Sequence, residues 1–169
     1  MKLLKTILVA ISFISAGLLW ITREKYLPSL SAFALSPNAM FYRAMHISMM
    51  LFLMINAVDF KKYATEFALA GGMGLILIFD MYNTPTLHNV LTVSTVLLAC
   101  VTLLVNSKIN KKVAWGLIIG AVGIFAYGYF TDFHFLLAEV LCMACLSAGK
   151  LVEIYSKGDY WEEDWSSYG

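Results

Sequence analysis

Charged residues are scarce in this sequence. Lysine, arginine, aspartate and glutamate make up 14% of its 169 residues, against about 25% in a typical soluble domain. The net charge is only +1 and no basic stripe is present, which argues against binding to nucleic acid. Cysteine is also rare: the three copies all stand in apolar runs, which excludes a secreted disulfide scaffold. No P-loop motif is found, so nothing supports nucleotide-driven transport.

Apolar residues, in contrast, are abundant. They make up 60% of the chain, and the mean hydropathy is +0.76. Aromatic and branched side chains are too plentiful for a disordered chain. The composition therefore predicts a multi-pass integral membrane protein.

Six stretches are long and apolar enough to cross a hydrocarbon core about 30 Å thick. The predicted spans are 3–21, 40–58, 63–81, 87–105, 113–130 and 133–152. Proline, asparagine and charged residues separate them, and no connection is long enough for a second domain. We therefore expect an all-α fold in which residues 1–152 form a single six-helix transmembrane bundle. Residues 153–169 are expected to form an acidic, aromatic cytoplasmic tail.

Lysine and arginine in the connections predict the orientation, since they concentrate on the cytoplasmic side. With the N-terminus inside, nine such residues are cytoplasmic and three lie outside. The cytoplasmic set is Lys2, Lys5, Lys61, Lys62, Lys108, Lys111, Lys112, Lys150 and Lys157, and the outer set is Arg23, Lys25 and Arg43. Both termini are therefore expected in the cytoplasm.

Glycines in the third and fifth spans predict close helix packing. The spacing of Gly116 and Gly120 lets two backbones approach each other, which gains van der Waals contact within lipid. We favour packing within the chain as the interpretation, and a homodimer contact is the alternative.

Ionisable residues inside lipid are costly, so each one needs a partner, a polar cavity or a place near the interface. In the predicted orientation they gather in the outer half of the bundle. This candidate polar cluster consists of Arg43, His46, Asp80, His88, His134 and Glu139. Counting about 1.5 Å per residue places His46 and Glu139 at a similar depth, roughly 9 Å inside the boundary.

Three interpretations of this cluster are open. The first is structural: Arg43, one turn above His46, forms a buried ion pair with Glu139 that fixes the second span against the sixth. The second is a polar cavity that binds a lipid headgroup or another small ligand.

The third interpretation is a zinc site for hydrolysis of a lipid bond, because zinc held by histidines can activate water near neutral pH. Its ligands would be His46, His88, His134 and Asp80. No paired metal-ligand spacing occurs in the sequence, so these ligands would have to converge from different helices. The sequence therefore predicts no cofactor, and zinc belongs only to this third interpretation.

One further spacing, Cys142-Met143-Ala144-Cys145, matches redox and zinc motifs. It lies within an apolar run, where thiolates are disfavoured. We interpret these cysteines as packing residues.

Two regions of the sequence, each made of two short segments, resemble a known family. Residues 26–31 (YLPSLS) and 37–45 (PNAMFYRAM) resemble the first-loop region of the Frag/DRAM/Sfk superfamily, and 79–80 with 87–90 resemble its connection between the third and fourth helices. The pattern positions are Pro37, Phe41 and His88. The chain lacks the family's Ser-Asp step near Ser31. The resemblance implies a six-span protein involved in lipid handling or membrane-stress responses.

A fainter likeness is to the CREST hydrolases, which combine histidines, an aspartate and a serine around zinc and carry paired C-terminal histidines that are missing here. The sequence identifies no catalytic residue. We expect a non-enzymatic protein that binds membrane lipids or a small ligand, or regulates a membrane-protein partner. The alternatives are a metal-dependent lipid hydrolase and an accessory subunit of a larger membrane complex.

Overall fold

The computed structural model describes residues 1–22, 30–60, 63–80, 82–105, 110–131 and 135–156. Within these ranges every regular element is helical. In chain order they are α1 (Lys2–Ile21), the 3-10 helix η1 (Leu30–Leu35), α2 (Ala39–Phe60), α3 (Tyr63–Ile78), α4 (Pro85–Val105), α5 (Lys111–Thr131) and α6 (Phe135–Ser156). The all-α prediction is thereby confirmed.

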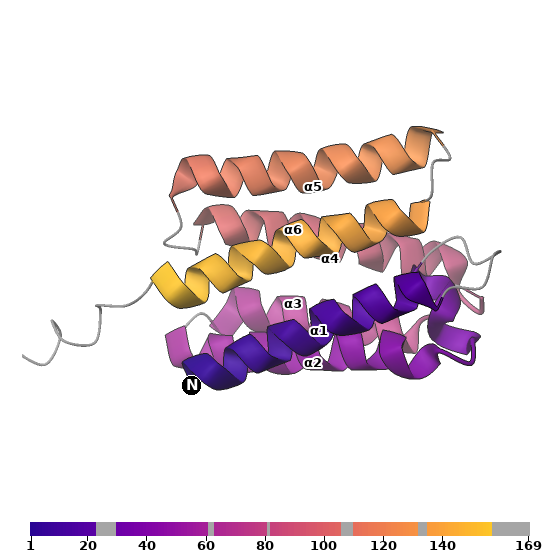
Figure 1. The fold of residues 1–169 in the computed structure, drawn as a ribbon, viewed down its shortest axis with the longest axis horizontal. Helices are drawn as coiled ribbons and strands as arrows, with labels where there is room; N and C mark the ends of the chain where they lie inside the picture. Colours follow the sequence, from indigo (N-terminus) through magenta and orange to yellow (C-terminus); the bar gives the residue numbers. More distant parts are fainter. Residues whose placement is uncertain (23–29, 61–62, 81, 106–109, 132–134, 157–169) are drawn as a thin grey trace, which may run out of the picture.

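The long helices lie roughly along one axis and alternate in direction (Figure 1). The start of α1 and the end of α6 lie at one end of the bundle, and η1 and the start of α2 lie at the other. Helix α1 packs against α2 and α6, α2 against α3, α3 against α4, and α5 against α6. Helix α4 packs only sparsely against α5 and α6, so this side of the bundle is the least closed.

Four helical segments are long and apolar enough to cross a membrane, as expected of a membrane protein. They are Lys2–Ile21, Ala39–Asp59, Pro85–Val105 and Lys111–Gly128. Helix α3 offers a shorter apolar segment, Ala64–Ile78. Helix α6 is not among the four, and it carries Glu139, Lys150 and Glu153.

Helix α3 ends three residues before the predicted limit of its span because Asp80 builds a turn. The Asp80 Oδ1 atom accepts hydrogen bonds from the backbone N–H groups of Tyr82 and Asn83, at 2.8 and 2.9 Å. Helix α4 then begins at Pro85, which fits the first helical position because proline has no N–H to leave unpaired there.

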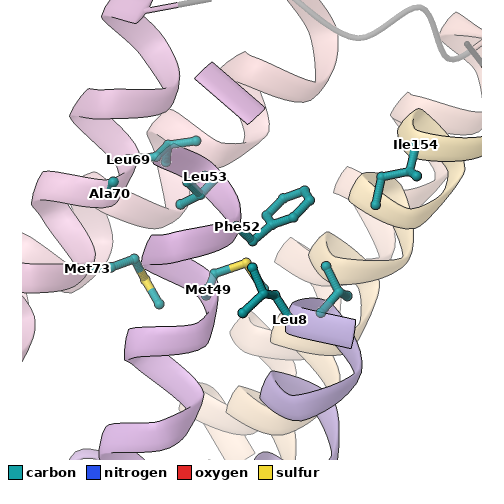
Figure 2. Packing of buried hydrophobic residues seen from close by; sticks show 9 residues of the cluster. Leu8, Met49, Phe52, Leu53, Leu69, Ala70, Met73 and Ile154 are labelled. Carbon is teal, nitrogen blue, oxygen red and sulfur yellow. The ribbon is translucent and has the colours of Figure 1, made fainter. Parts of the chain in front are cut away.

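The main apolar core lies where α1, α2, α3 and α6 meet. Figure 2 shows Phe52 of α2 between Leu8 of α1 and Ile154 of α6, with Leu69 and Met73 of α3 on the other side of α2. Phe52 is completely buried. These contacts join the first and last helices of the described chain.

Two features differ from the sequence prediction. The connection after α1 contains η1, whose Phe33 is fully buried, because the apolar stretch 30–35 packs against α1 and α2. Helix α6 continues to Ser156, four residues beyond the predicted span, and Ile154 is 1% exposed. The predicted tail therefore begins as part of the bundle, and its remainder, 157–169, lies outside the described residues.

Close helix contacts occur at glycines other than the predicted pair. A Cβ atom at Gly72 of α3 would lie 2.5 Å from Oγ1 of Thr95 in α4, and one at Gly149 of α6 would lie 2.8 Å from Leu103. In α5, a Cβ at Gly116 would meet nothing within 4 Å, and one at Gly120 only Cys145 at 3.9 Å. The close contacts are therefore made by the backbones of Gly72 and Gly149 with side chains of α4. The glycines of α5 make no such contact within the described chain.

Candidate functional site: a cavity inside the bundle

A cavity runs inside the bundle, between α2, α3, α4 and α6. Its volume is about 120 Å³. Its walls are mostly apolar and include Met49, Met73, Ile76, Val96, Leu103 and Leu146. On α6 the lining extends from Glu139 to Lys150, which corresponds to roughly 16 Å along the helix axis. This is close to the thickness of one leaflet of a hydrocarbon core about 30 Å thick.

Two predicted residues, His46 and His88, line the cavity near its end by η1. Both side chains are buried, at 5% and 3% exposure. The Nδ1 atom of His46 lies 3.0 Å from the carbonyl oxygen of Tyr42, one turn earlier in α2. The Nδ1 atom of His88 lies 2.7 Å from the carbonyl oxygen of Phe79. Each ring is therefore held by the backbone through one nitrogen.

A third predicted residue, Glu139, lines the same end from α6. Its Oε2 atom accepts a hydrogen bond from the backbone N–H of Leu30 at 2.6 Å. This contact ties η1 to α6. Thr92, one turn along α4 from His88, also lines the cavity, and its buried Oγ1 has no hydrogen-bond partner among the described residues. We call His46, His88, Thr92 and Glu139 the histidine end of the cavity.

The other predicted cluster residues are placed elsewhere. Arg43 is exposed and does not line the cavity. The expected ion pair between Arg43 and Glu139 is not among the ion pairs of the described residues, so that prediction is wrong for this structure. The reason is angular: residues three apart on a helix differ by about 60° around the axis, and α2 turns His46 inward. His134 lies outside the described residues.

Asp80 makes its hydrogen bonds within the turn after α3 and does not line the cavity. Besides the two backbone contacts, its Oδ2 accepts a hydrogen bond from the Nδ2 of Asn83 at 2.7 Å. The hydrogen bonds from Asn83 lower the pKa of Asp80 below its ordinary value of 3.8, since they favour the charged form. The part of the chain that the structure describes contains no group of three or more histidine, cysteine, aspartate or glutamate side chains placed to hold a metal.

The opposite end of the bundle holds a buried ionic cluster that was not predicted. Lys150 of α6 donates to Glu66 Oε1 of α3 at 2.7 Å and to Glu153 Oε2 at 3.4 Å. Glu66 is 0% exposed and Glu153 1%. Lys150 also forms the last part of the cavity wall.

A second buried lysine forms its own polar contacts at the same end of the bundle. Lys5 of α1, 1% exposed, forms an ion pair with Asp59 and donates to Asn56 Oδ1 of α2 at 3.1 Å. Two buried atoms, Asn56 Nδ2 and Glu66 Oε2, have no partner among the described residues. Asn56 Nδ2 is a donor and Glu66 Oε2 is an acceptor, so these two atoms leave no excess of donors or of acceptors at this end. We call Lys5, Asn56, Asp59, Glu66, Lys150 and Glu153 the lysine end.

Sequence analysis missed the lysine end because Lys5 and Lys150, which lie inside their predicted spans, were counted only as cytoplasmic charges that set the orientation. One signal was available. Lys150 and Glu153 are three residues apart on one helix, a spacing that brings opposite charges together. Glu66 stands only three residues into its predicted span, so a charge-pairing argument applied to both ends of the spans would have included it.

The cysteines behave as predicted. Cys100, Cys142 and Cys145 are free, and Cys142 packs in an apolar cluster with Cys100, Leu103 and Leu146. Comparison with known proteins adds nothing to this geometry, because the chain matches no protein-family model, no curated protein and no solved structure.

Proposed function

We propose that this protein is a six-span membrane protein that binds one amphiphilic, lipid-like molecule inside its helix bundle. The observation that carries the proposal is the apolar cavity with polar groups collected at its histidine end. Ligand sites typically combine apolar walls with a few polar groups that fix orientation. The chain of the ligand would lie along the apolar walls and its polar head would meet His46, His88 and Glu139.

The composition of the cavity walls supports an apolar occupant. Water is a poor filling, because it needs several polar partners and the walls supply few. A hydrocarbon chain restores the missing van der Waals contacts.

The surroundings of the cavity support entry from the membrane. Helix α4 packs sparsely against α5 and α6, so we expect an apolar ligand to enter between α4 and α6. Both termini are proposed to be cytoplasmic, on the excess of lysine predicted for that side. The histidine end would then face the outer leaflet.

The proposal is tested by blocking the cavity. Val96 of α4 lines it, whereas Val93, on the same helix, is 50% exposed on the outside. The protein is extracted from membranes in a mild detergent, and its bound lipid is measured by native mass spectrometry. The wild type and Val93→Phe are expected to carry about one lipid-like molecule per chain. Val96→Phe is expected to reduce that occupancy about tenfold, because the ring occupies the ligand's space.

Equal occupancy in Val96→Phe and Val93→Phe would overturn the proposal, since any bound lipid would then lie on the outer surface of the bundle. A wild-type protein free of bound lipid, and unable to take up an added long-chain alcohol, amine or acid, would overturn it as well.

One observation favours the metal-dependent hydrolase as a second candidate. Histidines that bind metal through Nε2 usually donate their Nδ1 proton to a backbone carbonyl or carboxylate, and both His46 and His88 have Nδ1 in this position. Metal analysis of the purified protein tests this candidate. Stoichiometric zinc that is lost in His46→Gln would support it, and protein without zinc after dialysis against zinc would overturn it.

A further inference from the structure

The hydrogen bonds of the two cavity histidines fix what each ring offers to a ligand. The Nδ1 atoms of His46 and His88 both face backbone carbonyl oxygens, at 3.0 and 2.7 Å. A carbonyl oxygen only accepts, so Nδ1 must carry the proton in each ring. In a neutral imidazole the other nitrogen, Nε2, is then an acceptor. Neither Nε2 has a hydrogen bond to any described residue, so both remain available.

Glu139 adds further acceptors at the same end. Its Oε2 already accepts from the Leu30 N–H, and a carboxyl group keeps further acceptor lone pairs on its two oxygens. Three hydroxyl groups line this end, those of Ser31, Tyr42 and Thr92, and each supplies one proton. Even if all three donate inward, acceptors remain in excess.

Positive charge is absent from this end within the described cavity wall. The one described cation that lines the cavity, Lys150, lies at the opposite end and contacts Glu66 and Glu153. Arg43 is exposed and is not part of the wall. Among the described residues, a phosphate or carboxylate head would therefore meet acceptors and a carboxyl group, with no cation to bind it.

We propose that the ligand's polar head is a hydrogen-bond donor, a hydroxyl or an ammonium group, and that the site rejects anionic heads. The orphaned Thr92 Oγ1, one turn along α4 from His88, independently points to a missing polar partner at this depth. This inference rests on the proposed function and names the class of amphiphile: a long-chain alcohol or amine, or a lipid that presents such a head.

Four probes with the same hydrocarbon chain test the inference: hexadecanol, hexadecylamine, hexadecanoate and hexadecyl phosphate. Their occupancy is measured by native mass spectrometry of the delipidated wild-type protein at neutral pH, with Val93→Phe and Val96→Phe in parallel. The alcohol, the amine or both are expected to bind about tenfold or more tightly than the two acids. A head that donates a hydrogen bond to the buried acceptors gains about this much affinity over a head that leaves them unpaired.

The variant Glu139→Gln distinguishes the two donor heads. Glutamine keeps the shape and an oxygen that accepts from Leu30, but it carries no charge. If the head is an ammonium, hexadecylamine is expected to lose about tenfold in affinity while hexadecanol changes little. If the head is a hydroxyl, hexadecanol binds the wild type most tightly and is weakened about tenfold in His88→Phe, which removes the acceptor Nε2.

Failure of this inference is distinguishable from failure of the proposed function. If the acids bind as tightly as the alcohol and amine, and Val96→Phe but not Val93→Phe abolishes all binding, the cavity proposal stands and the inference about the head is overturned. If none of the probes responds to Val96→Phe, the proposed function is overturned and the inference with it.

Discussion

The two ends of this bundle handle polar groups within an apolar protein in different ways. At the lysine end, cations and carboxylates from α1, α2, α3 and α6 contact one another directly. At the histidine end, two imidazoles and a carboxyl group line a cavity without a cation among the described lining residues. In a lipid environment polar groups persist when they are paired or when they serve a purpose. The first end therefore joins helices through ion pairs, while the second is proposed to bind the polar head of a ligand.

The largest expected effect comes from breaking the lysine end. Replacing Lys150 by methionine keeps the length of the side chain but removes the ammonium group that contacts the buried Glu66 and Glu153. Removal of one partner from a buried pair typically costs about 3–5 kcal/mol. We expect Lys150→Met to lower the free energy of unfolding by about this amount in a detergent titration with sodium dodecyl sulfate.

Two matched variants sharpen this comparison. Lys112→Met removes an exposed lysine and should change the free energy of unfolding by less than about 0.5 kcal/mol. Glu139→Gln, at the histidine end, should cost no more than about 1 kcal/mol, since its contact with Leu30 is kept. A Glu139→Gln variant as unstable as Lys150→Met would contradict the distinction between the two ends.

A smaller loss of stability is expected from Gly72→Ala, at the contact between α3 and α4, which form adjacent walls of the cavity. Gly72→Ala brings a Cβ to within 2.5 Å of Thr95 Oγ1. Thr95 is stiff about its first torsion, so the helices must separate, at a cost of about 1–3 kcal/mol. The thermal unfolding midpoint in detergent should fall accordingly.

Gly116→Ala is the control for this contact. Nothing lies within 4 Å of the added Cβ, and alanine is favoured over glycine in a helix by about 0.5–1 kcal/mol. This variant should therefore be as stable as the wild type or slightly more so. A Gly116→Ala variant that is less stable, with a lower oligomeric mass, would instead support the alternative interpretation of this glycine as a contact between two copies.

The smallest expected effect concerns Asp80, whose turn lies at the histidine end. Hydrogen bonds from Asn83 lower its pKa in the folded protein, so the charged carboxylate contributes stability above the ordinary value of 3.8. That contribution is lost as the pH falls from this value through the lowered pKa. The stability difference between wild type and Asp80→Ala should be equal at pH values of about 5 and 8 and shrink only in stronger acid. A difference that already changes above about pH 5 would contradict the assignment of this shift to Asp80.

The positions of the helices could be predicted because long apolar runs have few other structures available in lipid. Depth counting along α2 and α6 likewise predicted that His46 and Glu139 lie near the same level, and both line one cavity. The direction in which a side chain points around its helix axis is harder to predict from sequence. Arg43 shares the depth of the histidine end but points outward, because the rotation of α2 is set by packing of residues such as Tyr42 and Met45 against η1 and α1.

The cavity itself could not have been predicted. It results from the space left between α2, α3, α4 and α6, and such a space depends on crossing angles and side-chain volumes rather than on any local pattern. The lysine end was predictable in part, since Lys150 and Glu153 are neighbours on one helix. Its partner Glu66, which is 84 residues away from Lys150, is known only from the fold.

That separation has a consequence for how the protein is made. Glu66 leaves the ribosome long before Lys150 does, so α3 is synthesised with a carboxyl group whose cation is not yet present. The contact between Glu66 and Lys150 can form only after α6 has been made. Docking of the last helix is thus expected to be the step that completes the native assembly.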